Sequence, residues 1–171
     1  IRDQPRSRGL GDVYKRQFSL ADRCGIILDQ ELKQYDIPYN VHHEPNSLEV
    51  AKFLNKGVYV DVKVVTNDCA DHSLQHKELG EIRGKLSNNF PSGSKVKLLL
   101  QPEDLEHDDK SNLQLDVVDK KFKGTNFIYT LKTKSNKNIL VFVHSHHVHQ
   151  HQINDKFGIK NPIHIKHLVC F

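Results

Sequence analysis

After residue 57 the sequence changes to short apolar stretches with a period of two, and this restricts the rest of the chain to β-sheet structure. In residues 58–65, valines at every second position alternate with other side chains, as in a strand with one buried face. Six further strands are predicted at residues 79–86, 95–100, 113–121, 125–133, 138–144 and 163–171. Seven short strands at hairpin-like spacing predict a small antiparallel barrel.

Two parts of this barrel are predicted in more detail. In residues 125–143, Phe127, Tyr129 and Leu131 are expected to lie on one face of the sheet. After a turn, Leu140 and Phe142 on the next strand are expected to lie on the same face. The polar residues 67–76 are expected to form a loop.

Residues 18–57 have a different pattern, with the end of a helix at 18–23 and a short apolar strand at 25–28. A hairpin partner at 32–37 follows, and Pro38 opens a short helix at the position where a missing N–H costs nothing. A second helix is predicted at 47–54, where Leu48, Ala51 and Leu54 recur at helical spacing.

The first residues of the chain dominate its net charge. Residues 7–17 resemble the in-frame translation of a transposase adapter for sequencing libraries, so residues 1–17 are expected to be an unstructured artefact. A basic N-terminal arm is the alternative. Without residues 1–17 the chain has 20 basic and 19 acidic groups, a net charge of +1 instead of +4. This argues against a nucleic-acid partner, because phosphate binding needs an excess of cations.

Four segments in a fixed order carry a family resemblance. Ala-Asp-Arg at 21–23 ends a helix, Pro38 and Pro45 flank the next one, and residues 50–54 read Val-Ala-Lys-Phe-Leu. Leu-Leu-Gln-Pro-Glu-Asp-Leu follows at residues 99–105. Together they resemble the ATP-binding subunits of ABC importers of the iron(III) and polyamine type. The family has glycine at the position of Gln30 and arginine at that of Gln101.

The resemblance implies a domain organisation. Residues 18–56 would be the C-terminal end of an ABC nucleotide-binding domain, and residues 58–171 a transport-associated OB domain (TOBE type 2). The expected fold class is therefore mostly β, an OB-type small antiparallel barrel preceded by a short α/β remnant of the ATPase domain. The three cysteines, at positions 24, 69 and 170, form neither a zinc motif nor an even set, which suits a reducing compartment.

For the full-length protein, the resemblance implies a homodimer that uses ATP and Mg²⁺ to drive membrane permease subunits from the cytoplasmic face. A solute-binding protein would be an indirect partner, and details of the sequence resemble the iron-type members most. The present chain would be the regulatory and dimerisation part. Part of the apolar surface of residues 163–171 is expected to fold back onto the barrel core, and the rest to contact the second subunit. It shows no Walker A, Walker B, signature or switch-histidine motif, so no catalytic or cofactor-binding residue and no ATPase activity are expected.

A run of histidines is the main candidate for other chemistry, because imidazole is the commonest ligand of transition metals. Its members are His144, His146, His147, His149 and His151. Metal sites usually add a cysteine or carboxylate at fixed spacing, and the run contains none. We therefore expect a solvated loop with adventitious metal affinity, and no metal site.

Two charged stretches have alternative interpretations. Glu103, Asp104 and residues 107–109 could serve acid–base chemistry or bind a hard cation, but they are interpreted as a solvated turn after a strand. Residues 120–124 combine lysines with Phe122, as in a groove for single-stranded nucleic acid. The preferred interpretation is structural, because the family resemblance implies that Phe122 packs the barrel and that Gly124 makes a tight bend.

Two other functions remain as alternatives to the importer subunit. One is a stand-alone OB-fold module that binds oligonucleotides or oligosaccharides, because the fold alone permits it. The other is a histidine-rich metal-binding protein.

Overall fold

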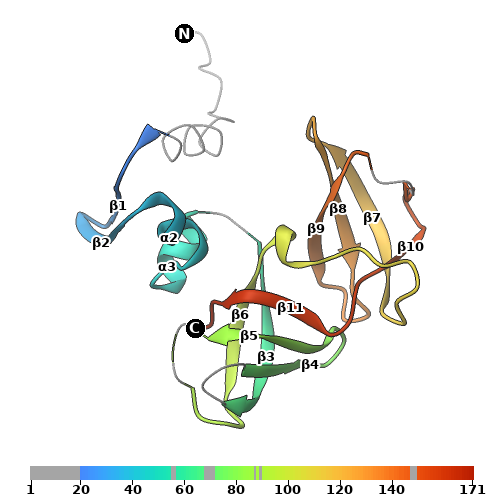
Figure 1. The fold of residues 1–171 in the computed structure, drawn as a ribbon, viewed down its shortest axis with the longest axis horizontal. Coiled ribbons are helices and arrows are strands. Elements are labelled where there is room, and N and C mark those ends of the chain that lie inside the picture. Colours follow the sequence, from blue (N-terminus) through green and yellow to red (C-terminus); the bar gives the residue numbers. More distant parts are fainter. Residues whose placement is uncertain (1–19, 55–56, 68–71, 87, 89, 147–149) are drawn as a thin grey trace, which may run out of the picture. The chain divides into compact units, whose positions relative to one another are not determined.

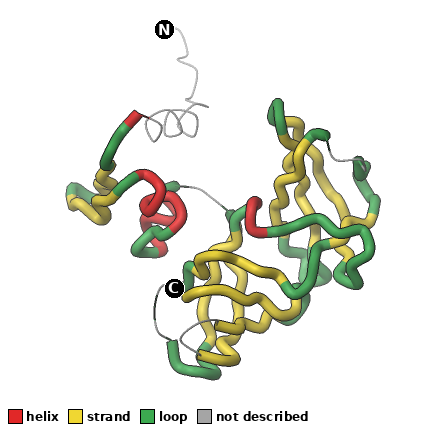
Figure 2. The backbone as a smooth tube through the Cα atoms, viewed as in Figure 1, coloured by secondary structure: helices red, strands yellow, loops and turns green. Residues whose placement is uncertain are grey.

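The computed structural model describes residues 20–171, apart from 55–56, 68–71, 87, 89 and 147–149. The chain divides into two compact units, Ile1–Asn55 and Lys56–Phe171 (Figure 1). Strands account for most of the regular structure, which confirms the mostly β fold class (Figure 2). The adapter-like residues 7–17 lie outside the described residues. Among the residues that are described, no helix is long and apolar enough to span a membrane.

The first unit contains a two-stranded antiparallel hairpin followed by two short helices. These elements are β1 (Cys24–Leu28), β2 (Glu31–Asp36), α2 (Pro38–His43) and α3 (Leu48–Phe53). The two-residue turn between the strands places Asp29 at φ 49° and Gln30 at φ 65°. Positive φ at both central residues is the geometry of a type I′ turn, where glycine is favoured. Gln30 therefore adopts the backbone conformation that glycine accepts most easily.

The two helices of this unit begin as their sequences predict. Pro38 occupies the first turn of α2, and the Ser47 hydroxyl accepts the backbone N–H of Val50 at 3.3 Å to cap α3. A small core then forms between the hairpin and the helices from Ile26, Val41, Val50 and Leu54. The opposite face of the hairpin is also apolar, because Ile27, Leu32 and Tyr35 lie there with 58–66% of their surface exposed.

The second unit contains nine strands and one 3₁₀ turn in its described part. They are β3 (Val58–Asn67), β4 (His72–His76), β5 (Gly80–Leu86), β6 (Lys95–Leu100), η1 (Pro102–Asp104), β7 (Gln114–Phe122), β8 (Asn126–Lys132), β9 (Asn138–His144), β10 (Lys156–Gly158) and β11 (Ile163–Leu168). Seven of these strands match the predicted ones. The sequence pattern missed β4 and β10.

Strand β4 falls where a loop was expected, so that prediction was wrong. The segment looks polar, yet His72, Leu74 and His76 form its buried face. The Nδ1 atom of His76 accepts the backbone N–H groups of Glu78 and Leu79 at 3.1 and 3.0 Å, and Nδ1 of His72 accepts a further backbone N–H. A neutral histidine with a satisfied ring nitrogen can be buried at low cost.

Five of the strands close into an OB-type barrel. They form one sheet in the order β11-β5-β4-β3-β6, in which β11 and β5 are parallel and the other pairs are antiparallel. The residues after β11 then return to β6, since the N–H of Leu99 donates to the carbonyl of Val169 and Lys97 exchanges two hydrogen bonds with Phe171. The sheet thereby closes on itself as a five-stranded Greek-key barrel. Its one parallel pair departs from the all-antiparallel pairing that was expected.

Gly84 permits the parallel contact that closes the barrel. A Cβ atom at this position would lie 1.8 Å from the carbonyl oxygen of Ile165 on β11. No side chain fits at that distance, so the pairing of β5 with β11 depends on a glycine here.

The remaining strands form a second sheet, β10-β7-β8-β9, inserted between the fourth and fifth barrel strands (Figure 1). Its buried side chains, such as Tyr129, Val141 and Phe157, belong to the same core cluster as Leu74 and Leu98 of the barrel. The insertion is therefore packed onto the barrel through a shared core.

The predicted face of β9 was wrong. Tyr129 and Leu131 of β8 are buried as expected, but their partners across the strands are Val141 and Ile139. Leu140 and Phe142 lie on the other, half-exposed face. The segment is apolar at every position, so periodicity could not choose the face, and the pairing register with β8 decides it.

Most of the apolar surface of residues 163–171 lies inside this unit, in agreement with the expectation that part of it folds back onto the barrel core. Ile163, Ile165, Leu168 and Val169 are each at most 5% exposed, and only Phe171 of this group is partly accessible. These side chains fill the barrel core, because β11 pairs with β5 and the residues after it pair with β6. The last strand is therefore not available as an apolar contact surface.

Candidate functional site

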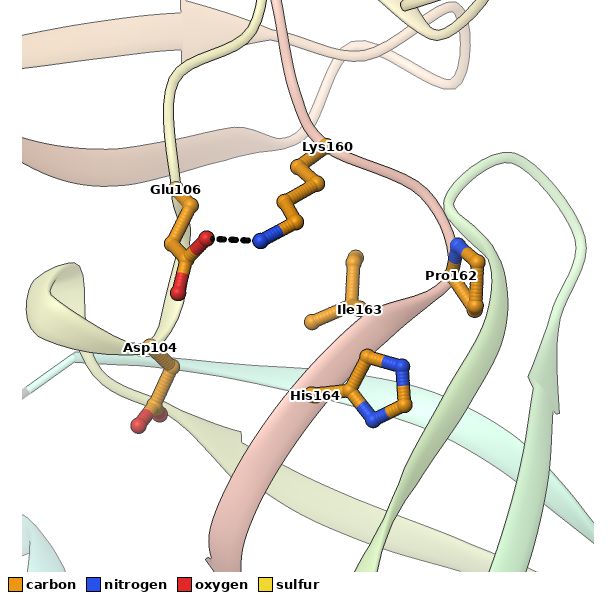
Figure 3. A pocket seen from close by; sticks show the side chains of 6 residues that line it. All are labelled: Asp104, Glu106, Lys160, Pro162, Ile163 and His164. Atoms are coloured by element: carbon orange, nitrogen blue, oxygen red, sulfur yellow. Dashed lines mark hydrogen bonds and ion pairs between the residues drawn. The ribbon is translucent and has the colours of Figure 1, made fainter.

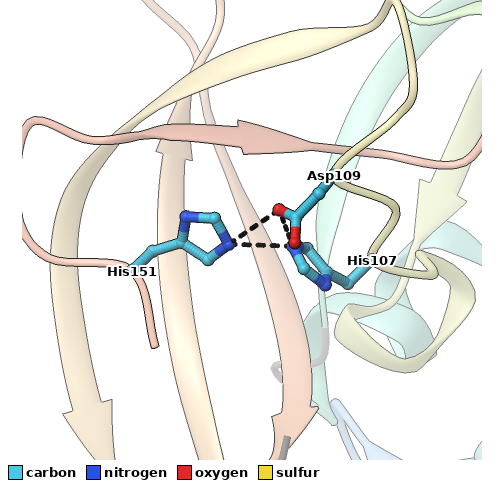
Figure 4. Close-up of side chains that lie close together, drawn as sticks. All are labelled: His107, Asp109 and His151. Atoms are coloured by element: carbon cyan, nitrogen blue, oxygen red, sulfur yellow. Dashed lines mark hydrogen bonds and ion pairs between the residues drawn. The ribbon is translucent and has the colours of Figure 1, made fainter. Parts of the chain in front are cut away.

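Two histidines and a carboxylate from separate segments meet beside the inserted sheet. His107 and Asp109 lie in the loop between η1 and β7, and His151 lies in the segment before β10. Figure 4 shows the three side chains pointing toward one another. Although His107 and His151 are 44 positions apart in the sequence, their rings are in contact.

The three functional atoms of this cluster are in mutual contact. Nε2 of His107 lies 2.8 Å from Nε2 of His151 and 2.9 Å from Oδ1 of Asp109. The same carboxylate oxygen lies 3.3 Å from Nε2 of His151. The imidazoles are largely buried, with 5% and 13% of their side-chain surface exposed, whereas 43% of Asp109 is exposed. The cluster is therefore closed on the side of the rings and open to solvent beside the carboxylate.

Aromatic packing holds both rings in place. The ring of Phe157 on β10 lies 4.6 Å from that of His107 and 4.9 Å from that of His151, centroid to centroid. Tyr129 of β8 meets His151 edge to face at 6.2 Å. Phe157 and Tyr129 are themselves fully buried. The orientation of the two imidazoles is thus set by the core of the domain.

Backbone contacts bring the two segments together. The N–H of Asp108 donates to the carbonyl of Gly158, and His107 forms an isolated antiparallel bridge with Ile159. A Cβ atom on Gly158 would lie 2.0 Å from the carbonyl oxygen of Asp108. Glycine at this position therefore allows the loop carrying His107 and Asp109 to approach β10.

The cluster includes one of the five histidines singled out in the sequence. His144, at the end of β9, and His146, in the following turn, are exposed, and His151 is the one that joins the cluster. His147 and His149 lie outside the described residues. His107 and Asp109 were interpreted as a solvated turn, and no local spacing could link them to His151, because the connection depends on where β10 pairs.

A second group of polar residues lines a small hollow at the end of η1 (Figure 3). Lys160 donates to Glu106 at 2.6 Å there, and Asp104 accepts the backbone N–H of Gln101 at 2.7 Å. Burial raises the pKa of Asp104 from 3.8 to about 7, against the smaller effect of that hydrogen bond. The hollow has a volume of about 20 Å³, room for about one water molecule, so it is too small to hold a metabolite.

The lysine-rich stretch at 120–124 does not pack as expected. Phe122 is 62% exposed, so the expectation that it packs the barrel was wrong. Lys120 instead lies over the ring of Phe127 at 4.6 Å, and Lys121 pairs with Asp119 at 2.9 Å. Gly124 has φ 79°, which fits the tight bend predicted for it. Two of the three cations are thus engaged within the domain.

Comparison with known proteins gives three relatives, all named spermidine/putrescine import ATP-binding protein PotA. The chain is 27% identical over 147 residues to that of Mycoplasma genitalium, covering 82% of this chain and 24% of the relative. It is 23% identical over 129 residues to the protein of Mycoplasmopsis synoviae, covering 72% of this chain and 27% of the relative. It is 24% identical over 100 residues to the protein of Photobacterium profundum, covering 56% of this chain and 26% of the relative. No protein-family model matches the chain.

These proteins are distant homologues of the chain. The sequence spans about a quarter of the length of each relative. The resemblance to ABC importer ATP-binding subunits is thereby confirmed at the level of distant homology. All three relatives carry polyamine names, so they give no support to the expected similarity to the iron-type members.

Proposed function

We propose that this chain is the C-terminal part of the ATP-binding subunit of an ABC importer for polyamines. The observation that carries the proposal is the length of the similarity. The 147 residues matched to the Mycoplasma genitalium protein exceed the length of the second unit, so the match extends into the first. Residues 18–56 then correspond to the end of the nucleotide-binding domain and residues 58–171 to a transport-associated OB domain.

The exposed apolar face of the β1–β2 hairpin supports this assignment. Ile26 packs against the helices, while Ile27, Leu32 and Tyr35 on the opposite face are 58–66% exposed. Strands that are apolar on both faces are typical of a sheet covered on both sides, and an isolated two-stranded hairpin is at best marginally stable. The rest of an ATPase domain would cover this face in the complete subunit.

The proposal assigns the OB-type domain a regulatory and dimerisation role. ATP and Mg²⁺ would be bound by parts of the subunit outside this sequence, and two subunits would drive the permease from the cytoplasmic face of the membrane. A solute-binding protein would deliver the substrate. Because the apolar residues of β11 fill the barrel core, a contact between two OB-type domains would use other surfaces.

A chimera tests the proposal directly. Residues 20–171 replace the matching segment of the Mycoplasma genitalium protein, and spermidine uptake is measured in cells that supply its permease. We expect uptake above that of a chimera with an unrelated OB barrel. Uptake no higher than with the unrelated barrel would refute the assignment.

A pair of substitutions in the chimera tests the covered face. Ile27→Asp places a charge on the hairpin face that the ATPase domain should bury, and Ile153→Asp places one at an exposed position of the second unit, where 55% of the side chain is accessible. We expect the first to abolish uptake and the second to preserve it. Equal uptake by both variants would contradict burial of the hairpin face.

A further inference from the structure

We propose that His107, Asp109 and His151 form a binding site for a divalent transition-metal ion of the zinc class. The inference does not depend on the importer assignment, because it rests on the geometry of these three side chains.

The distances between the three atoms suit a single shared ion. Ligand atoms around tetrahedral zinc lie about 2.0–2.2 Å from the metal, so they are about 3.3–3.6 Å from one another. The three pairs measure 2.8, 2.9 and 3.3 Å, slightly tighter than that arrangement. An ion just outside their plane, on the solvent side, would contact all three after small side-chain adjustments. The fourth position would then face water, next to the exposed edge of Asp109.

The chemistry of the three atoms also favours a cation. A neutral imidazole nitrogen either carries one hydrogen or offers one lone pair, and an ionised carboxylate only accepts. Two neutral imidazoles bring at most one hydrogen to each Nε2 atom, so at least one of the three close pairs is left without a well-aligned hydrogen bond. A metal ion attracts two lone pairs and a carboxylate simultaneously.

The type of ligand indicates which metals fit. Imidazole suits zinc, copper, iron and nickel, whereas magnesium and calcium prefer sites made wholly of oxygen atoms. Two imidazoles and one carboxylate, with one open position, match the three-ligand set of a zinc site that keeps a water molecule.

The surrounding structure prepares the site. Phe157 and Tyr129 fix the two rings, and the close approach at Gly158 fixes the loop between His107 and Asp109. A bound ion would join this loop to the segment before β10. Since the ion binds the folded arrangement better than the unfolded chain, it should stabilise the domain.

Metal titration of the full chain tests the site. Chelator-treated protein is titrated with Zn²⁺ and, separately, Co²⁺, using calorimetry, the visible absorption of Co²⁺ and the melting temperature as readouts. We expect one equivalent to bind, a Co²⁺ spectrum typical of tetrahedral coordination, and a rise in melting temperature with Zn²⁺. Absence of binding, or binding of Zn²⁺ without a rise in melting temperature, would overturn the proposal.

Matched variants locate the ion. His151→Gln and Asp109→Asn remove ligands, while the double change His144→Gln and His146→Gln removes exposed histidines from the same region. We expect each ligand variant to weaken Zn²⁺ binding by about 100-fold or more, because even the loss of an outer partner costs about 10–100-fold. The double variant should bind as the wild type does.

The opposite pattern would overturn the proposal. If the double variant loses binding and His151→Gln keeps it, the exposed histidine run holds the metal. Far-UV circular dichroism verifies that each variant is folded, and Asp109→Asn, at a partly exposed position, provides a ligand change that leaves the buried rings intact.

Discussion

Replacing Asp104 with asparagine is expected to stabilise the protein above about pH 7 and to have little effect near pH 4. The carboxyl group lies at the end of η1 and accepts the backbone N–H of Gln101. Its pKa is raised from 3.8 to about 7, mainly by burial; the hydrogen bond from Gln101 opposes this rise, and the charge of Glu103 adds a smaller part of it. Among the described residues no ion pair forms with Asp104, because Lys160, which lines the same hollow, pairs with Glu106.

The direction and size of the effect follow from proton linkage. Between pH 3.8 and about 7 the folded protein holds a proton on Asp104 that the unfolded chain has lost. The contribution of Asp104 to the stability of the folded protein is therefore fully present below pH 3.8 and is lost as the pH rises to about 7. The full pKa difference corresponds to at most about 4 kcal/mol. Since solvent reaches part of the carboxyl group, we expect about 2–3 kcal/mol.

Urea unfolding from pH 4 to pH 8, followed by circular dichroism, measures this contribution. Asparagine keeps an oxygen that can accept the Gln101 N–H but never becomes charged, so the difference in unfolding free energy between variant and wild type isolates Asp104. Glu103→Gln is the control, and it should keep most of the wild-type pH dependence because burial is the larger cause. A pH dependence of Asp104→Asn equal to that of the wild type would contradict a raised pKa of Asp104, as would an Asp104 carboxyl carbon in the wild type that titrates near pH 4 by NMR.

Three further tests of the fold use urea unfolding. Gly84→Ala places a Cβ atom 1.8 Å from the carbonyl oxygen of Ile165, so we expect the free energy of unfolding to fall by more than about 3 kcal/mol. The control Gly124→Ala, at φ 79° with open space around it, should lower it by about 1 kcal/mol. Similar losses in both variants would contradict the role of Gly84 in closing the barrel. The His76→Asn variant should lose less stability than the wild type below pH 6.5. Burial lowers the pKa of His76, so on acidification the unfolded chain binds a proton at this position before the folded protein does. An acid dependence equal to that of the wild type would contradict this role of His76. Gln30→Gly should raise the free energy of unfolding of the first unit by about 1 kcal/mol, since a φ of 65° suits glycine. A variant no more stable than the wild type would argue against the type I′ turn.

Local sequence signals were enough to locate most of the helices and strands. Alternating valines located β3, and Pro38 and Ser47 located the starts of two helices, because each of these signals acts within a few residues. The spacing of the two hairpin strands placed a turn at Gln30, and the family resemblance implied the bend at Gly124. The mostly β composition and the relation to importer ATP-binding subunits also followed from local motifs in a fixed order.

Which distant residues meet could be seen only in the folded chain. The face of β9 depends on its register with β8, since an uninterrupted apolar segment has no period to read. The burial of His76 depends on backbone N–H groups that satisfy its ring nitrogen. The meeting of His107 with His151 depends on the pairing of β10 with β7 and on the close approach at Gly158. Contacts between segments far apart in the chain arise from packing and register, and no spacing along the sequence encodes them locally.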